Sequence, residues 1–240
     1  MCGRYTITNP EALRGLVQWI CEGEDVWQET APRWNIHPED TMAIVHRSVD
    51  AGCQVKPMRW GLVPFWEKSS KPKLAPINAR SGEAFAKPFF RQAIQKRRCL
   101  VPADGFYEWP KQERTGRAPR HPNYYTLTDH RPFFFAGIFE TAVEGLRPDT
   151  FTLFTTAPNS LLLALPHERM PVILESERAK EWIRPGPISE PGFLDLCRTF
   201  PADQMTTWRV STLVNKPGNE GPECAAPLDA GGSDQASFGF

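Results

Sequence analysis

Short runs of apolar and β-branched residues, some alternating with polar ones, predict a series of short strands along the chain. Strand patterns of this kind are bounded by Gly, Pro, Asn and Asp. They cover residues 3–8, 41–47, 55–63, 124–128, 133–139, 151–157 and 205–211. Within 99–109, two further short strands flank the turn signal Ala103-Asp104-Gly105.

Helix signals are fewer. Asn9 is a suitable N-cap and Pro10 suits a first helical turn, so we expect a helix over 10–20. Residues 81–95 should be helical in pieces broken at Pro88, Ser176 should cap a helix running to Ile183, and 191–198 should form another. Because strands and helices do not alternate regularly, a doubly wound parallel sheet is disfavoured. The pattern favours an α+β fold of curved, barrel-like antiparallel sheets with peripheral helices.

The chain of 240 residues is long enough for a substantial core. We expect one domain over 1–215. From Lys216 the sequence is rich in Gly, Pro, Ser and Asp and poor in large apolar residues, which predicts a disordered tail over 216–240. The N-terminus lacks a basic, then apolar, secretory signal, and no apolar run reaches the roughly 18 residues of a membrane span. We therefore expect a cytoplasmic monomer, associated with the nucleoid in a bacterium or nuclear in a eukaryote.

Six cysteines are scattered along the chain, with no CxxC pair and no histidine at zinc-finger spacing. We therefore expect neither a disulfide framework nor a bound metal, and reduced thiols are the default expectation in this compartment. Five of the six are interpreted as buried small apolar residues or surface positions without a role. Only Cys2 differs, because of its position.

Cys2 directly follows the initiator Met1, which is removed from many proteins whose second residue is small. The mature chain would then begin with an amine and a thiol on adjacent carbons. The α-amine has a pKa of about 7.7 to 8.0, so an appreciable fraction of it is neutral and nucleophilic near pH 7. It can form an imine with an aldehyde, and the thiol can then close a five-membered thiazolidine in an intramolecular step. The alternative is that Cys2 is simply a tolerated small residue.

Local charge is uneven although the formal net charge is +0. Residues 84–103 contain five basic side chains and no acid: Lys87, Arg91, Lys96, Arg97 and Arg98. Aromatic residues occur nearby, among them Trp60, Trp66 and Phe89. Basic groups neutralise phosphates and aromatic rings stack on unpaired bases, as binding of single-stranded nucleic acid requires. A solvated surface over core aromatics is the alternative explanation.

Eight sequence blocks resemble, in order, those of the SOS-response-associated peptidase (SRAP) family, which includes abasic-site-processing proteins. The similarity spans roughly residues 2 to 215. The blocks are MCGRY at 1–5, RWNIHP at 33–38, MRWGLVPFW at 58–66, INARS at 77–81, RRCLVPADGFYEW at 97–109, FAGIFE at 135–140, TTAPN at 155–159 and HERMPV at 167–172.

The resemblance implies a SRAP-type fold and a set of catalytic residues. Cys2 would be the crosslinking nucleophile, Asn78 would hold the N-terminal group by hydrogen bonds, and Glu108 and His167 would move protons. It also implies DNA-binding residues, for which our candidates are Arg4, Arg33, Pro38, Trp60, Trp66, Arg80 and Thr156. Of these, Trp60 is the one that a strand position would most readily place in a core.

The implied function is covalent capture of abasic sites in single-stranded DNA, without a cofactor or metal. A thiol-dependent peptidase activity, of which removal of Met1 is the minimal case, and a weak lyase activity are further implications. Two alternatives remain open from sequence: an amidase or peptidase with an N-terminal cysteine nucleophile, and a noncovalent module for single-stranded DNA. A neutral pocket with an oxyanion hole would favour the amidase, whereas basic and aromatic side chains favour nucleic acid.

Overall fold

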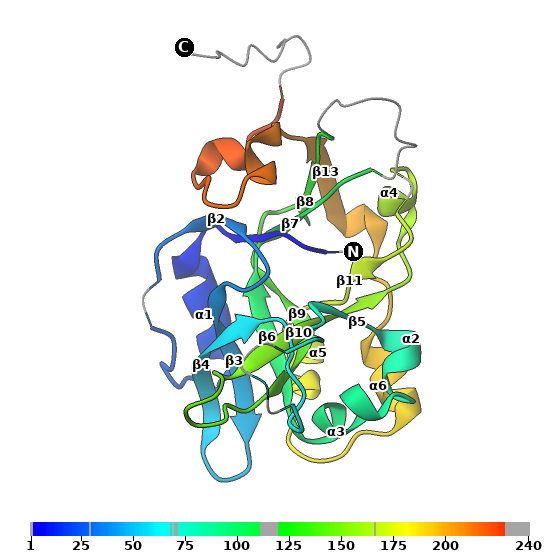
Figure 1. Cartoon of the computed structure of the whole chain (residues 1–240). Helices are drawn as coiled ribbons and strands as arrows, with labels where there is room; N and C mark the ends of the chain where they lie inside the picture. The colour runs from blue at the N-terminus through cyan, green and yellow to red at the C-terminus, as the bar shows by residue number, and fades with distance from the viewer. Residues whose placement is uncertain are drawn as a thin grey trace.

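A computed structural model describes residues 2–28, 30–67, 69, 72–110, 120–165 and 167–228. It confirms the α+β class: two sheets are built from short strands, and the helices lie around them (Figure 1). None of the helices within these ranges is long and apolar enough to cross a membrane. Residues 229–240, the last part of the predicted tail, lie outside the described ranges.

The larger sheet closes on itself as a barrel. Its ring runs β10-β4-β3-β6-β9 and returns to β10, because β10 pairs with both β4 and β9. The ring strands are β3 (Thr41–Ser48), β4 (Gly52–Trp60), β6 (Arg98–Ala103), β9 (Phe133–Glu140) and β10 (Thr150–Thr156). Three short strands extend it: β5 (Asn78–Arg80) and β11 (Met170–Pro171) pair with β10, and β12 (Ile173–Leu174) pairs with β9.

The expectation of purely antiparallel sheet was incomplete, since β10 runs parallel to both β4 and β5. Parallel neighbours need a long crossover connection. The chain supplies one, because β6 to β9 and two helices lie between these strands in sequence. The short strands β5, β11 and β12 carry too little pattern for sequence reasoning to detect.

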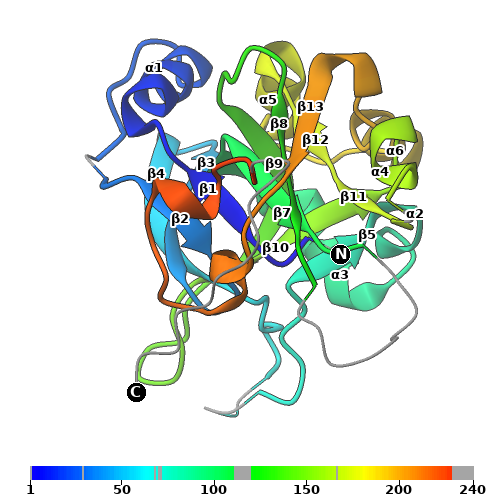
Figure 2. The same cartoon turned by 90° about the horizontal axis from the view of Figure 1, so that it is seen from above.

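The second sheet has the order β13-β8-β7-β1-β2 and is entirely antiparallel. Its strands are β1 (Tyr5–Ile7), β2 (Arg33–Ile36), β7 (Gly105–Glu108), β8 (Asn123–Leu127) and β13 (Met205–Arg209). The two predicted strands around Asp104 are thus both present, but they belong to different sheets. The turn at Asp104 carries the chain from β6 of the barrel to β7 of the second sheet. Figure 2 shows β1, β7 and β8 of the second sheet from above.

Six α-helices occur in the described ranges, and most follow their capping signals. They are α1 (Pro10–Ile20), α2 (Ser81–Ala84), α3 (Pro88–Lys96), α4 (Ser160–Leu163), α5 (Ser176–Trp182) and α6 (Glu190–Leu196). The Asn9 side chain accepts a hydrogen bond from the Ala12 amide, as expected for the N-cap of α1. Ser176 was predicted as a cap but is the first helical residue; the cap position is Glu175, without a side-chain hydrogen bond.

Aromatic side chains fill the space between the two sheets. Tyr5 of β1 packs edge-to-face on Trp60 and Phe135 of the barrel, with ring centroids 5.3 and 5.8 Å away. Trp60 is fully buried, and its indole N–H donates to the carbonyl of Ile77 at 2.9 Å. These contacts press the start of the chain firmly against the barrel.

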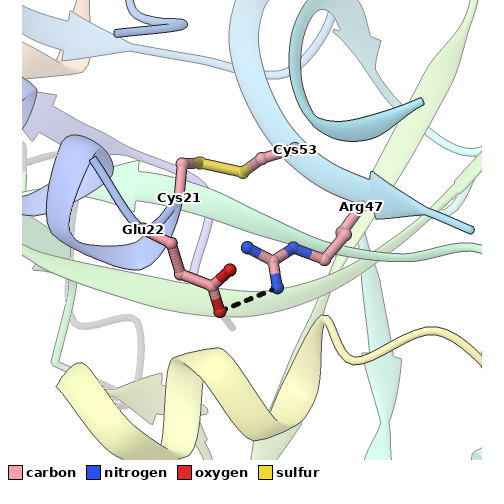
Figure 3. The surroundings of a disulfide bond; sticks show 4 residues. All are labelled: Cys21, Glu22, Arg47 and Cys53. Carbon is pink, nitrogen blue, oxygen red and sulfur yellow. Dashed lines mark hydrogen bonds and ion pairs between the residues drawn. A yellow bond between two sulfur atoms is a disulfide. The ribbon is translucent and has the colours of Figure 1, made fainter. Parts of the chain in front are cut away.

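The expectation of six reduced cysteines was wrong in one respect: Cys21 and Cys53 form a disulfide. The bond joins the end of α1 to β4, beside an ion pair between Glu22 and Arg47 (Figure 3). The two residues are 32 positions apart in sequence, so only the folded chain brings them together. Their Cα atoms lie 5.5 Å apart, within the ordinary range for a disulfide.

The predicted disorder from Lys216 was also wrong for residues 216–228, which are packed. Glu220 accepts hydrogen bonds from the Arg33 guanidinium and the Trp34 amide, at 2.7 and 2.8 Å. Cys224 is buried in a small apolar cluster with Tyr107 and its neighbours on the second sheet. The Gly- and Pro-rich composition gave no sign of these contacts, because the partners on β2 and β7 lie far earlier in the chain.

Candidate active site

Cys2 is brought to Glu108 by the pairing of β1 with β7. Tyr5 lies opposite Phe106 in this antiparallel ladder, and the Tyr107 amide donates to the Arg4 carbonyl at 3.0 Å. Continuing the same register toward the chain start places Gly3 opposite Glu108. Cys2 and Glu108 therefore lie at one end of the ladder, although 106 positions separate them in the sequence.

Asn78 holds the backbone of Cys2. Its side-chain amide donates to the Cys2 carbonyl oxygen at 2.7 Å. Asn78 is the first residue of β5, which lies parallel to β10 with Asn78 opposite Leu153. The barrel thereby fixes an amide against the first residues of the second sheet. The sequence-based expectation placed Asn78 on the N-terminal group, and this contact is consistent with it.

His167 meets Glu108 from the barrel side. Its ring Nδ1 lies 3.7 Å from Glu108 Oε2, and both side chains are almost completely buried, at 4% and 3% exposure. His167 lies between α4 and β11, and its backbone amide donates to the Leu162 carbonyl at 3.2 Å. Cys2, Asn78, Glu108 and His167, all predicted from sequence, are thus brought together at the junction of the two sheets.

Burial controls the protonation of this site. It raises the pKa of Glu108 from 4.5 to about 7, and the positive amino terminus of the chain opposes the increase. Burial also raises the pKa of the Cys2 thiol far above its usual value, and the negative charge of Glu108 adds to this effect. Near neutral pH, Glu108 can therefore either give or accept a proton, whereas the thiol remains protonated.

Basic side chains border the site at the end of β10. Arg80, in register with Thr155, keeps its side chain about half exposed and pairs with Glu83 at 3.3 Å. Arg169 donates through Nε to the Thr155 hydroxyl at 2.8 Å, and burial together with the charge of Arg80 lowers its pKa. Thr156 is nearly buried at the same strand end. Arg169 was not among the predicted DNA-binding residues, although it lies in the HERMPV block.

The other two predicted arginines also make contacts within the protein. Arg4 is partly buried and donates to the Gly3 carbonyl at 3.0 Å. Arg33 pairs with Asp40 and Glu220, at 2.9 and 2.7 Å, so two carboxylates already face its charge.

Of the two predicted stacking residues, only Trp66 is accessible. Trp60 as a base-stacking residue was wrong, because its ring is fully buried between the sheets. Trp66 is 49% exposed and packs edge-to-face against Phe65 and Phe89, with centroids 4.9 and 5.6 Å away. Pro38 lies partly exposed in the turn between β2 and β3. Trp66 and Pro38 remain predicted DNA contacts.

The basic run over 84–103 is only partly a surface feature. Arg98 is buried and donates to backbone carbonyls of Ile94 and Trp182, at 2.7 and 2.6 Å. Arg97 forms an ion pair with the buried Glu140 at 2.8 Å. Arg91 and Lys96 are exposed, so the charge available to a phosphate backbone is smaller than the sequence suggested.

The fold and the site define an α+β protein with a second-residue cysteine at the junction of a barrel and an antiparallel sheet. Residues 1–217 match the family model described as SOS response associated peptidase (SRAP), and the chain belongs to this family.

Two named relatives and two solved structures resemble most of the chain. The abasic site processing protein YoqW of Bacillus subtilis is 35% identical, over 93% of this chain and 98% of its own. The abasic site processing protein HMCES of Pongo abelii is 30% identical, over 95% of this chain and 77% of its own. A crystal structure from Bacteroides thetaiotaomicron has a TM-score of 0.75 at 24% identity, covering 95% of this chain and all of the other. A phage-related protein of Bordetella bronchiseptica has a TM-score of 0.69 at 26% identity, covering 87% of this chain and 94% of the other.

Proposed function

We propose that this protein senses abasic sites in single-stranded DNA and captures them covalently through Cys2 after removal of Met1. The observation that carries the proposal is the arrangement around Cys2: the Asn78 amide donates to its carbonyl, the Glu108 carboxyl lies near its thiol, and the His167 ring lies beside Glu108. The names of the relatives YoqW and HMCES support an abasic site as the target.

The α-amine of Cys2 is the first nucleophile in this proposal. An abasic site exists partly as a ring-opened aldehyde, and amine attack followed by loss of one water gives an imine. The raised pKa of the buried thiol supports this order, because a protonated thiol is a weak nucleophile toward the aldehyde. Asn78 would hold the Cys2 carbonyl and so keep the adjacent amine oriented toward the sugar.

Glu108 and His167 move the protons. With a pKa near 7, the Glu108 carboxyl can protonate the departing sugar or carbinolamine oxygen and later accept a proton. The thiol then adds to the imine carbon and its proton passes to the ring nitrogen, which closes the thiazolidine without loss of further atoms. An open imine would permit β-elimination and strand cleavage, so ring closure protects the strand. A weak lyase activity is expected only where closure is slow.

The DNA strand would lie over the exposed edge of this junction. Arg80 and Arg4 would contact phosphates, and Trp66 and Pro38 would contact bases flanking the lesion. No base needs to be flipped out, because the lesion lacks one. Removal of Met1, by the protein itself or by an aminopeptidase, exposes the amine that the reaction requires.

Intact-mass spectrometry tests the proposal directly. The protein is mixed with a uracil-containing oligonucleotide that uracil glycosylase has converted to an abasic strand. The expected product has the mass of the protein without Met1 plus the oligonucleotide, less one water. A chain that retains Met1, or whose terminal amine has been acetylated, should give no product. An undiminished yield from either would contradict the proposal.

Variants separate the alternatives. Cys2→Ala should lose the stable adduct and keep noncovalent binding, whereas a noncovalent DNA-binding module would give no denaturation-resistant species with the parent protein either. Glu108→Gln and His167→Ala should each slow adduct formation. If both react at the parental rate, the proton-transfer roles are wrong. An amidase or peptidase would instead cleave amide substrates in a Cys2-dependent way.

A further inference from the structure

Asp104 is a buried carboxylate, only 5% exposed, that binds the beginning of the chain. Its Oδ1 accepts a hydrogen bond from the Thr6 hydroxyl at 2.5 Å. Its Oδ2 accepts from the Thr8 hydroxyl at 2.8 Å, from the Asn9 amide at 2.9 Å, and from the Thr8 amide. One side chain thus collects four donors from residues 6 to 9, at the end of β1 and the cap of α1.

The surrounding backbone fixes Asp104 in turn. Its amide donates to the Thr6 carbonyl at 3.1 Å, and its carbonyl accepts from the Thr126 hydroxyl at 2.7 Å. The Thr6 hydroxyl also lies 2.9 Å from the Tyr124 hydroxyl. Gly105 makes that approach possible, because a Cβ there would lie 2.0 Å from the Tyr124 oxygen.

Asp104 and the candidate active site lie at opposite ends of the same two-strand ladder. Thr6 faces Gly105 beside Asp104, while Cys2 lies four residues before Thr6 and Glu108 lies three residues after Gly105. The short β1–β7 pairing, with its few backbone hydrogen bonds, connects Asp104 to the active-site end of the ladder. A one-residue slip of register turns every side chain of a strand to the opposite face. The hydrogen bonds at the Asp104 end of the ladder therefore determine the direction in which the Cys2 side chain points.

We infer that Asp104 is a positioning residue for the reaction of Cys2: its four hydrogen bonds to residues 6–9 lock the β1–β7 register that holds Cys2 against Glu108. The inference rests on the proposed function for its role in adduct formation. The locked register itself is a property of the protein without DNA. Asp104 touches neither Cys2 nor the DNA in this scheme; it acts through the ladder.

Asp104→Asn tests the inference while keeping the size of the side chain. An amide has only one acceptor oxygen, and its NH2 group would face the donors of Thr8 and Asn9. Thr126→Val is the matched control, because it removes a buried hydrogen bond from the same turn without touching residues 6–9. All measurements are made well below the melting temperature of the least stable variant. Should Asp104→Asn not fold, Thr8→Val, which removes one of the four donors, replaces it.

The first readout needs no DNA. Cys2 is fully buried, so its alkylation by iodoacetamide, followed by peptide mass spectrometry, reports release of the chain start. Asp104→Asn should raise the alkylation rate of Cys2 at least tenfold, with the rate of the buried Cys197 unchanged in the same sample. Thr126→Val should leave Cys2 at the parental rate. Unchanged Cys2 reactivity in a folded Asp104→Asn protein would overturn the inference.

The second readout is the kinetics of adduct formation with the abasic oligonucleotide. Asp104→Asn should lower the maximal rate at saturating DNA about tenfold and leave the half-saturating concentration unchanged. A purely structural role would lower only the melting temperature. If the parent protein forms no adduct, the proposed function fails, and the alkylation experiment still decides whether Asp104 locks the register.

Discussion

Glu108 is an almost completely buried carboxyl group that can be protonated near neutral pH. Burial raises its pKa from 4.5 to about 7. Between those values the folded protein binds more protons than the unfolded chain, so the free energy of unfolding falls as the pH rises. Each pKa unit corresponds to about 1.4 kcal/mol, so above about pH 7 the shifted pKa of Glu108 lowers the free energy of unfolding by roughly 3 kcal/mol.

Glu108→Gln removes this titration and keeps the shape of the side chain. Near pH 8 we expect the variant to be more stable than the parent by up to roughly 3 kcal/mol. Near pH 4.5 the two proteins should differ little, because the parent carboxyl is then largely protonated in the folded state and no longer destabilises it. For a domain of this size, that gain corresponds to an increase in melting temperature of about 6 to 10 °C. The same variant should form the DNA adduct more slowly, so stability and reactivity change in opposite directions.

Thermal unfolding monitored by circular dichroism, at several values between about pH 4.5 and 8, measures the difference. Glu144→Gln is the matched control, because Glu144 is an exposed glutamate in the turn between β9 and β10. Its melting temperature should follow that of the parent at every pH. The reasoning is refuted if the stability gain of Glu108→Gln is the same near pH 4.5 as near pH 8, or if there is no gain.

Three other predictions concern stability and binding. Replacing both Cys21 and Cys53 by Ala should destabilise the protein by about 4 kcal/mol, because the unfolded chain regains the entropy of a loop closed over 32 residues. The melting temperature should fall by about 8 °C. A thiol titration that finds six free cysteines in the unreduced parent would contradict this prediction. Gly105→Ala should lower the free energy of unfolding by about 2 kcal/mol or more, because the new Cβ would displace the Tyr124 hydroxyl. A melting temperature equal to that of the parent would disprove this close packing. Arg80→Gln should weaken binding to single-stranded DNA. The slope of log K against the logarithm of the salt concentration should become shallower by about 0.7, because one phosphate contact is lost. An unchanged slope in a titration from low to moderate salt would show that Arg80 does not contact a phosphate.

Local patterns predicted much of the fold. The helix α1 begins and ends where Asn9, Pro10 and the apolar spacing placed it, and the break at Pro88 separates α2 from α3. The long barrel strands β3, β9 and β10 also lie within a few residues of their predictions. These elements follow from caps, proline geometry and periodicity, which act over only a few residues.

Other features depend on contacts between distant parts of the chain. The local sequence around Trp60 is the same whether its ring stacks on a base or fills a core. The packing of Tyr5 and Phe151 against the ring places it in the core. Arg97 and Arg98 resemble surface charges in the sequence until Glu140 and backbone carbonyls are brought to them. Sequence separation hides such partners, because no local rule specifies them.

The sequence by itself determined which chemical groups are available: a cysteine directly after Met1, and an amide, a carboxyl and an imidazole within recognisable blocks. Tertiary structure alone decided that Asn78 and Glu108 lie at Cys2, that His167 lies beside Glu108, and that the pKa of Glu108 rises to about 7. The physical reason is that water is removed from a carboxyl only when separate strands close over it. The cost of that desolvation depends on surroundings that the linear order of residues does not contain.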